Sequence, residues 1–545
     1  MEKQKRHVSG RTVLLCIVLF FVLDRALSIG LFLPGFCVED ERWVRNAAVR
    51  MVTELEYNPG THKYPGLMPE LTALFYLGSY MASNYRALFH FESLESLAWD
   101  ISHYSFDFVS TIALGRLLVV ILGAVAIALF FVYVKREFGV TPALIGSLFM
   151  CTSPAFLFST QLLKNDVLVV MGVLLTLFAS LAMAKSDRTR YHVMGGLAFG
   201  FCMAAKYHLP AVVPLLVAHR LQRKELSFVK AFFTWRLAVL VFFSAAGFAL
   251  LSPATLADLP GAFHQAMVEL AIQNRFDPLF RRSPDNLLHL PVLFIFAAVL
   301  PLSLGLLLYL VSLVGLFTRT SFKTSGQLIT WSYPAAFLVF MIALSELGAP
   351  HLYTPVTPFF ALLAALVVAP LLDEENLIKR AAAIVVIGVV AGSNLAFMHS
   401  LNYYEDFVLR KSVESLEQKA GEGGSLALVP YYPNPDKKWE TRFVPQPFLS
   451  KEKLAKESPE RVLVHHAFYR AYGNNKLLLE NPKVRKMYRS YLLLRLGSLG
   501  YREEVRFTEH GLEGDSAIFM GSIYKRLMPD LEGIEASIYV KADEN

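Results

Sequence analysis

The sequence predicts an all-α membrane protein of about eleven spanning helices, followed by a small soluble α/β domain. Of its 545 residues, 54% are hydrophobic and only 18% are charged, whereas soluble domains carry about 25% charged residues. Long apolar runs recur up to residue 399, and the rest of the chain is charged and rich in turn residues. Lipid offers the backbone no hydrogen-bonding partner, so apolar runs of this length are expected to form helices.

Eleven apolar segments are candidates for spanning helices, because about 20 apolar residues cross a bilayer. The fifth and sixth adjoin at residues 207–210, where a proline could join them into one kinked helix. The first follows the basic residues 1–11 and lacks a small-x-small cleavage site, so we interpret it as a retained span. The segments are 12–34, 110–134, 140–160, 166–184, 191–206, 209–219, 236–252, 290–317, 328–347, 351–371 and 381–399.

The positions of Lys and Arg support this count and set the orientation. Membrane proteins concentrate basic residues in their cytoplasmic loops. With the amino terminus in the cytoplasm, every short loop on that side is basic, and merging the fifth and sixth spans would move the basic loop at 220–236 outside. The net charge of +7 has the same origin, so we expect no nucleic-acid partner. The basic residues of these loops are Lys135, Arg136, Lys185, Arg188, Arg190, Arg220, Arg223, Lys224, Lys230, Arg236, Arg319, Lys323, Lys379 and Arg380.

A change in composition near residue 400 predicts a domain boundary. Residues 1–400 would form the membrane domain, with exterior loops at 35–109 and 253–289. Residues 401–545 would form the soluble exterior domain. Within that domain the patterns predict helices at 403–420 and 483–496 and strands at 426–432 and 462–468.

Candidate chemistry begins with the acidic cluster Glu39-Asp40-Glu41 just after the first span. Adjacent carboxylates repel one another, and this repulsion together with the apolar boundary is expected to raise the pKa of one of them. A carboxylate with a raised pKa is suited to act as a general base. The alternative is an acidic loop that merely ends a span. Asp166 opens the apolar run 167–184 on the same side, where it could cap a helix, take part in catalysis, or do both.

Several cations and aromatic side chains are predicted on the same face. His62, Lys63 and Tyr64 precede the Pro65–Gly66 turn, and together they could bind an anionic head group or anchor the chain at the interface.

Arg116 and Lys206 lie within or against apolar runs, where a charge is costly and therefore indicates function, although Lys206 could extend to the surface. His351 and Tyr353 open the tenth span. Carboxylates and cations at a lipid boundary suit a substrate that has a phosphate and a lipid tail.

The chain shows no P-loop, no Gly-rich dinucleotide motif and no HExxH, which argues against an ATP-driven transporter and a zinc protease. A multi-span transporter or lipid flippase, and a structural subunit, are the alternatives.

Over roughly residues 12–400 the chain resembles the C-type membrane glycosyltransferases (glycosyltransferase family 39-like), especially the bacterial protein O-mannosyltransferase and aminoarabinose-transferase group. Gly66 stands where that family has a second proline, and His351 where it often has arginine. Before residue 120, Asp40-Glu41 matches the family's Asp-Glu pair, Lys63 to Leu67 resembles its Pro-Pro-Leu motif, and Gly115-Arg116-Leu117 resembles the start of its second span. Pro154 with Asn165-Asp166 resembles its second acidic site, and Gly195 to Tyr207 resembles its Gly-rich span. Tyr353, Pro355 and Pro358 resemble its Tyr-x-x-Pro-x-x-Pro sequence.

This resemblance implies transfer of a sugar from a polyprenyl-phosphate donor to a hydroxyl of a lipid, glycan or protein, with inversion at the anomeric carbon. Asp40 would be the general base. Glu41 and Asp166 would position the base or the acceptor. Lys63, Arg116 and Lys206 would hold the donor phosphate, and His62, Tyr64, His351 and Tyr353 would complete the substrate site.

The resemblance also implies an integral protein of the bacterial inner membrane in contact with membrane lipids, with its amino terminus in the cytoplasm and its carboxyl-terminal domain in the periplasm. No cofactor is required, although the carboxylates could hold a divalent metal.

Overall fold

The protein was analysed as a computed structural model. It describes residues 10–30, 39–54, 65–84, 106–265, 267, 291–319, 324–344 and 350–420, and in the carboxyl-terminal part 426–428, 443–445, 461–465, 489–494, 496, 498–499, 501–507 and 536–541. The chain forms two compact units. The first comprises Met1–Ile29, Asp40–Leu270 and Pro284–Leu395, and the second comprises Gly30–Glu39, Ala271–Ser283 and Ala396–Asn545. The boundary predicted at residue 400 lies close to Ala396.

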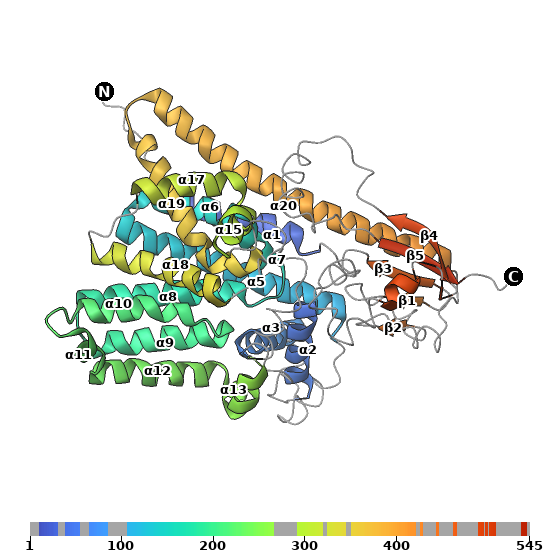
Figure 1. The fold of residues 1–545 in the computed structure, drawn as a ribbon, viewed down its shortest axis with the longest axis horizontal. Helices are drawn as coiled ribbons and strands as arrows, with labels where there is room; N and C mark the ends of the chain where they lie inside the picture. Colours follow the sequence, from blue (N-terminus) through green and yellow to red (C-terminus); the bar gives the residue numbers. More distant parts are fainter. Residues whose placement is uncertain are drawn as a thin grey trace. The chain divides into compact units, whose positions relative to one another are not determined.

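The first unit is built from helices (Figure 1), and each of the eleven predicted segments contains at least one of them. Its longer helices are α1 (Gly10–Ser28), α2 (Glu39–Thr53), α3 (Leu67–Ser83), α5 (Phe108–Phe138), α6 (Val140–Thr152), α7 (Pro154–Gln161), α8 (Asp166–Lys185), α9 (Thr189–Lys206), α10 (Val213–Leu221), α12 (Trp235–Leu251), α17 (Leu306–Arg319), α18 (Ser325–Leu344), α19 (Thr357–Asp373) and the first part of α20 (Leu377–Ala420). Shorter turns are η2 (Leu209–Val212), α11 (Phe228–Phe232), α13 (Pro253–Ala257), α15 (Pro291–Phe294), η4 (Ile295–Val299), α16 (Leu300–Leu304) and η5 (Pro350–Val356).

Five helices among the described residues are long and apolar enough to cross a membrane. They are Val109–Phe138, Asp166–Lys185, Ser325–Ala343, His351–Asp373 and Leu377–His399, and two bent pairs bring the number to seven. The predicted total of eleven therefore stays a prediction. The fifth and sixth segments form separate helices, α9 and α10, and α10 packs on α8 and α18.

Two of the predicted segments, 140–160 and 290–317, contain a sharp bend between two helices. The helices α6 and α7 meet at an angle of 60°, because Pro154 begins a new helix after Ser153 in extended conformation. The second bend lies between the helical segment Ile295–Leu304, which ends with α16, and α17, and its angle is 118°. Gly305 occupies this break with a φ of +81°, and Asn394 Nδ2 donates a hydrogen bond of 2.9 Å to the adjacent Leu304 carbonyl.

Small residues allow α9 and α12 to pack closely. A Cβ atom on Gly196 would lie 2.5 Å from the Leu240 carbonyl oxygen, and one on Gly200 would lie 2.6 Å from that of Ser244. The two glycines are four residues apart and so share one face of α9, the arrangement that lets membrane helices approach backbone to backbone. This contact fixes α9 beside α12, and α9 also packs on α8.

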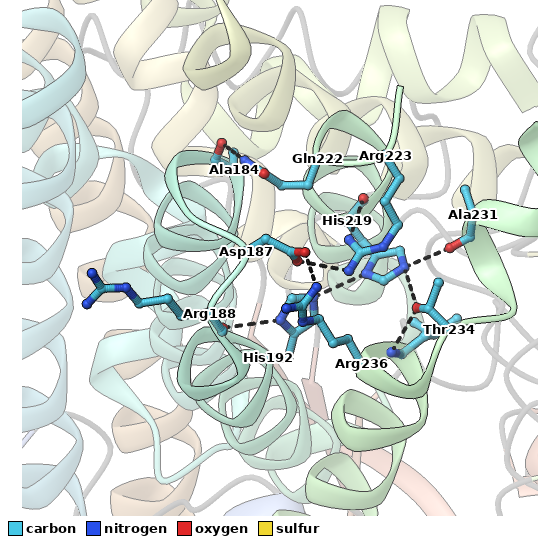
Figure 2. Close-up of polar contacts among 11 residues, drawn as sticks. Ala184, Asp187, Arg188, His192, His219, Gln222, Arg223, Ala231, Thr234 and Arg236 are labelled. Atoms are coloured by element: carbon cyan, nitrogen blue, oxygen red, sulfur yellow. Dashed lines mark hydrogen bonds and ion pairs between the residues drawn. The ribbon is translucent and has the colours of Figure 1, made fainter. Parts of the chain in front are cut away.

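A charged cluster ties the helices together at one end of the unit (Figure 2). Asp187, in the turn between α8 and α9, accepts a hydrogen bond of 2.8 Å from Arg223, and its other oxygen pairs with Arg236 at the start of α12. His192 Nε2 lies 3.2 Å from His219 Nδ1. Since α8 has 20 residues and rises about 1.5 Å per residue, this end lies about 30 Å along α8 from Asp166.

The second unit contains the end of α20 and a five-stranded sheet in the order β2-β1-β3-β5-β4. The strands β1 (Leu426–Leu428), β2 (Phe443–Pro445) and β3 (Arg461–His465) pair in parallel, and β5 (Ala536–Lys541) pairs antiparallel to β3 and to β4 (Tyr501–Phe507). The predicted strands overlap β1 and β3, and residues 489–494 are helical within the predicted 483–496. The predicted helix at 403–420 is the end of α20, which runs unbroken from the last membrane segment.

We expect Asp187→Asn to destabilise the protein, because it leaves Arg223 and Arg236 without their shared carboxylate. A hydrogen bond to a charged group contributes about 1.5–3 kcal/mol, so the unfolding temperature in detergent should fall by several degrees. Glu374→Gln is the matched control. The ion pair of Glu374 with Lys379 is exposed, at 40% and 51% of the two side chains, and such pairs contribute about 0–1 kcal/mol. Equal losses in the two variants would contradict the structural role of Asp187.

Candidate active site

The acidic cluster lies in the first turn of α2, where the helix dipole favours negative charge. The Glu41 carboxylate points into the first unit and forms a bidentate ion pair with Arg116 of α5. Arg116 Nε donates to Oε1 at 2.8 Å and Nη2 donates to Oε2 at 2.9 Å. Both side chains are completely buried. The pair therefore joins α2 to α5 without contact with solvent.

The same carboxylate also holds the segment that leads into α8. The backbone N–H of Leu163 donates to Glu41 Oε1 at 2.9 Å, and Arg116 Nη1 donates to the Ile29 carbonyl at 2.9 Å. Leu163 lies in the short link between α7 and α8. Glu41 thus fixes the stretch of chain that carries Lys164 and Asp166.

Asp166 and Lys206 form the second ion pair of this region, with Lys206 Nζ donating to Asp166 Oδ1 at 2.8 Å. Asp166 is the first residue of α8 and Lys206 the last residue of α9, so each charge lies at the helix end that stabilises it. Asn165 Nδ2 also donates to the Ala205 carbonyl at 2.8 Å. Asn165 is the N-cap residue of α8, so the interpretation of Asp166 as a helix cap was wrong.

A pocket opens over this second ion pair. Its cavity volume is about 20 Å³, within a hollow of about 290 Å³ that includes open solvent. Its lining residues are Trp43, Val44, Lys164, Asn165, Asp166, Lys206 and His351. The lining offers two lysines and a histidine beside one carboxylate, with an indole ring at the edge. The two cations suit an anionic group.

Lys164 is a pocket residue that the predicted site did not include. Its side chain is 7% exposed, and its Nζ lies 5.6 Å from the centroid of the Phe158 ring, within the range of a cation–π contact. The Phe158 ring in turn lies 5.8 Å from that of His351. A signal was present in the sequence, because Lys164 is a charge between two apolar runs, immediately before an acidic candidate.

The other predicted site residues are placed as follows. Lys206, Asp166 and His351 meet in the pocket, whereas Arg116 pairs with Glu41. Tyr353 is fully buried, with its ring 5.9 Å from that of Phe337, and does not line the pocket. Asp40 lies in the first turn of α2. The side chain of Asp40 and the residues His62, Lys63 and Tyr64 lie outside the described part of the structure.

Glu70, in the first turn of α3, is a second carboxylate that the predicted site did not include. It is 8% exposed, and its Oε1 atom is buried with no hydrogen-bond partner among the described residues. Burial raises the pKa of Glu70 to about 7. A single acidic residue within the apolar stretch 67–80 was the available sequence signal.

A divalent metal was expected to be compatible with the acidic residues. Across the described ranges, no three His, Cys, Asp or Glu side chains gather closely enough to hold a metal ion. The pocket itself supplies one carboxylate and one imidazole beside two lysines. A divalent ion needs several converging oxygen or nitrogen ligands, and metal binding stays a prediction.

Part of the chain matches a known protein family. Residues 71–249 match the family model described as dolichyl-phosphate-mannose-protein mannosyltransferase. Arg116, Asp166 and Lys206 lie within the matched range, and Asp40, Glu41 and His351 lie outside it. No curated protein matches the chain in the corresponding sequence comparison.

Solved membrane enzymes share the fold. The oligosaccharyltransferase of Archaeoglobus fulgidus in its apo form aligns at 11% identity with a TM-score of 0.54, covering 99% of this chain and 89% of its own. ArnT from Cupriavidus metallidurans in the apo state aligns at 15% identity with a TM-score of 0.51, covering 84% and 94%. The archaeal enzyme in complex with an inhibitory peptide and a dolichol-phosphate aligns at 11% identity with a TM-score of 0.50, covering 96% and 84%.

The apolar helices and the shared fold together identify an integral membrane protein. At these identities the solved structures report on the fold, and the family model adds a sequence match over part of the membrane region. The resemblance predicted from the sequence is therefore confirmed, and the chain has the fold of the C-type membrane glycosyltransferases.

Proposed function

We propose that the protein is an inverting glycosyltransferase that moves a sugar from a polyprenyl-phosphate donor to a hydroxyl group of a lipid, glycan or protein at the exterior face of the membrane. The observation that carries this proposal is the pocket where Lys164, Asp166, Lys206 and His351 meet at the ends of α8 and α9. The proposed setting is a bacterial inner membrane with the amino terminus in the cytoplasm and the carboxyl-terminal domain in the periplasm.

The pocket is suited to the donor phosphate because its cations are fixed before the ligand arrives. Asp166 holds Lys206 at 2.8 Å, and Lys164 is supported by the Phe158 ring. Charge-assisted hydrogen bonds from such cations are stronger than neutral ones. The polyprenyl phosphate gains negative charge as it leaves, so cations already in place stabilise the transition state.

Asp40 is the proposed general base. Trp43 and Val44 line the pocket and lie three and four residues after Asp40 on α2. Positions with this spacing share one face of an α-helix, which supports a pocket-facing Asp40. In the reaction Asp40 takes the proton of the acceptor hydroxyl while that oxygen bonds to the anomeric carbon. The bond from this carbon to the phosphate oxygen breaks with its electron pair, which gives polyprenyl phosphate and an inverted linkage.

Glu41 and Arg116 have a positioning role in this proposal. Both Glu41 oxygens already accept hydrogen bonds, and Arg116 is completely buried against it. We therefore propose that the pair orients α2 and the Leu163 segment and does not contact the acceptor or the donor phosphate. Lys63, His62 and Tyr64 stay the proposed further contacts to the donor, and the proposed reaction uses no cofactor.

The comparisons support the substrate class. One archaeal neighbour is described in complex with a dolichol-phosphate, which is a polyprenyl-type lipid phosphate, and the matched family is described as using dolichyl-phosphate-mannose. The same neighbour also holds an inhibitory peptide. This supports a protein acceptor as one of the three classes.

Asp40→Asn is expected to abolish sugar transfer while the protein still folds, because the amide cannot accept the hydroxyl proton. Loss of a general base lowers a rate about 10²–10⁴-fold. The measurement is transfer from radiolabelled undecaprenyl-phosphate sugars in membranes, with Glu39→Gln as the neighbouring control. Transfer at the wild-type rate by the Asp40 variant would contradict the base assignment.

Glu41→Gln is expected to reduce stability by about 3–5 kcal/mol, because it leaves the Arg116 charge buried without its partner. The double variant Glu41→Gln/Arg116→Met removes that charge and should regain much of the loss. Thermal unfolding of the detergent-solubilised variants measures both. If the single variant were as stable as wild type but inactive, Glu41 would instead take part directly in the reaction.

A further inference from the structure

A second and larger cavity lies in the first unit, at the opposite end from the candidate active site. Its volume is about 430 Å³, within a hollow of about 850 Å³ that includes open solvent. Its lining begins at Phe138, and the preceding Glu137 lies 3.7 Å from Lys185 at the end of α8. Asp166 begins the same helix, about 30 Å away. A cavity of this size falls within the range of small-molecule sites, about 300–1,000 Å³.

The lining is amphipathic. Most of its side chains are apolar, and the polar ones among the described lining residues are Thr141, Gln327 and Asp373. Val140 also lines the cavity and is 41% exposed, so an apolar side chain borders its opening. Such a lining fits a ligand that has a polar group and an apolar part.

Four helix termini meet at this cavity. The helices α5 and α19 end at it, whereas α6 and α18 begin at it. Helix ends favour cations at the carboxyl terminus and anions at the amino terminus. The first turn of α6 has no side-chain cap for its N–H groups, which can therefore be satisfied by a ligand. The cavity thus suits a ligand that carries both a negative and a positive group.

The end of α19 supplies acceptors for the positive group. Asp373 is the exposed last residue of α19, where the helix dipole disfavours a carboxylate. Thr141 Oγ1 donates to Asp373 Oδ1 at 3.4 Å, which is long for a hydroxyl donor. Pro370 lies within α19 and has no N–H, so the helix cannot supply the usual hydrogen bond to the Leu366 carbonyl. Leu366, Pro370 and Asp373 all line the cavity.

A primary ammonium group fits these acceptors best. It carries three N–H donors and a positive charge, so it can pair with the carboxylate and also donate to a backbone carbonyl. A quaternary ammonium group has the same charge but no N–H donor. The acceptors at the end of α19 therefore favour a primary amine over a fully methylated one.

We propose that this cavity binds the head group of a phospholipid that carries a primary ammonium group. The ammonium group pairs with Asp373 and the Leu366 carbonyl, and the phosphate lies at the first turn of α6. The acyl chains leave past Val140 into the bilayer. Lys135 and Arg136 in the last turn of α5 are typical of the membrane boundary, where head groups lie. This inference does not depend on the proposed sugar transfer.

The test compares phospholipids that differ only in their head groups. Full-length protein in nanodiscs is labelled with phosphatidylethanolamine that carries a photoreactive group in one acyl chain, and the labelled peptides are identified by mass spectrometry. Phosphatidylcholine and phosphatidylglycerol with the same acyl chains are used in parallel. The label from phosphatidylethanolamine should fall on the lining segments 138–142 and 366–373.

The head-group series separates charge from hydrogen bonding. Phosphatidylethanolamine should label these segments about tenfold more than phosphatidylcholine, which is the value of one hydrogen bond to a charged group. The monomethyl and dimethyl forms should fall between the two, because each methyl group removes one N–H donor and leaves the charge unchanged. Phosphatidylglycerol, which has no cation, should label least.

Three variants make the result specific to the cavity. Asp373→Asn removes the carboxylate charge, so the preference for phosphatidylethanolamine over phosphatidylglycerol should fall about tenfold. Glu374→Gln is the matched control, because this neighbouring carboxylate pairs with Lys379, and its labelling should equal that of wild type. Val140→Trp places a large side chain at the opening and should reduce labelling of the segments by all the lipids. Thermal unfolding checks that each variant is folded.

Several outcomes would overturn the proposal. Equal labelling by phosphatidylethanolamine and phosphatidylcholine in wild type would exclude recognition of the N–H donors. Strongest labelling by phosphatidylglycerol would exclude a cationic head group. A folded Asp373→Asn protein that keeps the full preference of wild type would show that the carboxylate does not bind the ligand.

Discussion

The candidate active site depends on the buried ion pair between Glu41 and Arg116. These residues are 75 positions apart in the chain, and their pairing fixes α2, α5 and the segment before α8 relative to one another. Charges removed from water are costly unless hydrogen bonds compensate them. Here the Ile29 carbonyl and the Leu163 N–H supply the additional bonds. Breaking the pair would release the segment that carries Lys164 and Asp166.

This arrangement gives neighbouring carboxylates different roles. Glu41 is fully engaged, Asp166 is held by Lys206, and Glu70 is buried with one oxygen unpaired among the described residues. In our account Asp40 is the carboxylate on the pocket side of α2, one helical turn before Trp43. In this proposal a single acidic motif supplies one residue that holds the fold and another that faces the substrate. Their spacing along a helix separates them by about 100°.

The sequence predicted the helical segments well, because hydrophobic run length and the distribution of Lys and Arg reflect the lipid environment directly. It also predicted that Asp166, Lys206 and His351 would contribute to one site, and the structure brings them together in the pocket. The bends after Thr152 and at Gly305 were not predicted, since an apolar run keeps the same composition whether the helix is straight or broken. The continuity of α20 from Leu377 to Ala420 was missed because composition changes near residue 400 while the backbone conformation does not.

The partners of each charge could not be predicted, because they depend on tertiary contacts. Arg116 was expected to bind phosphate, and nothing in its local sequence indicates that Glu41 neutralises it. Lys164 and Glu70 each appeared as single charges beside apolar residues, a pattern shared with ordinary interfacial residues. Short strands such as Phe443–Pro445 and the highly charged Tyr501–Phe507 lack the clear alternation that identifies a half-buried strand.

The central claim is that the pocket at the ends of α8 and α9 holds a lipid-linked sugar phosphate. Mass spectrometry of lipids that co-purify with the protein tests it most directly, with wild type compared with Lys164→Ala. The account predicts a polyprenyl-phosphate sugar bound to wild type and depleted from the variant, with the bulk phospholipids the same in both. Only bulk phospholipids in both samples, or equal amounts of the polyprenyl lipid, would contradict it.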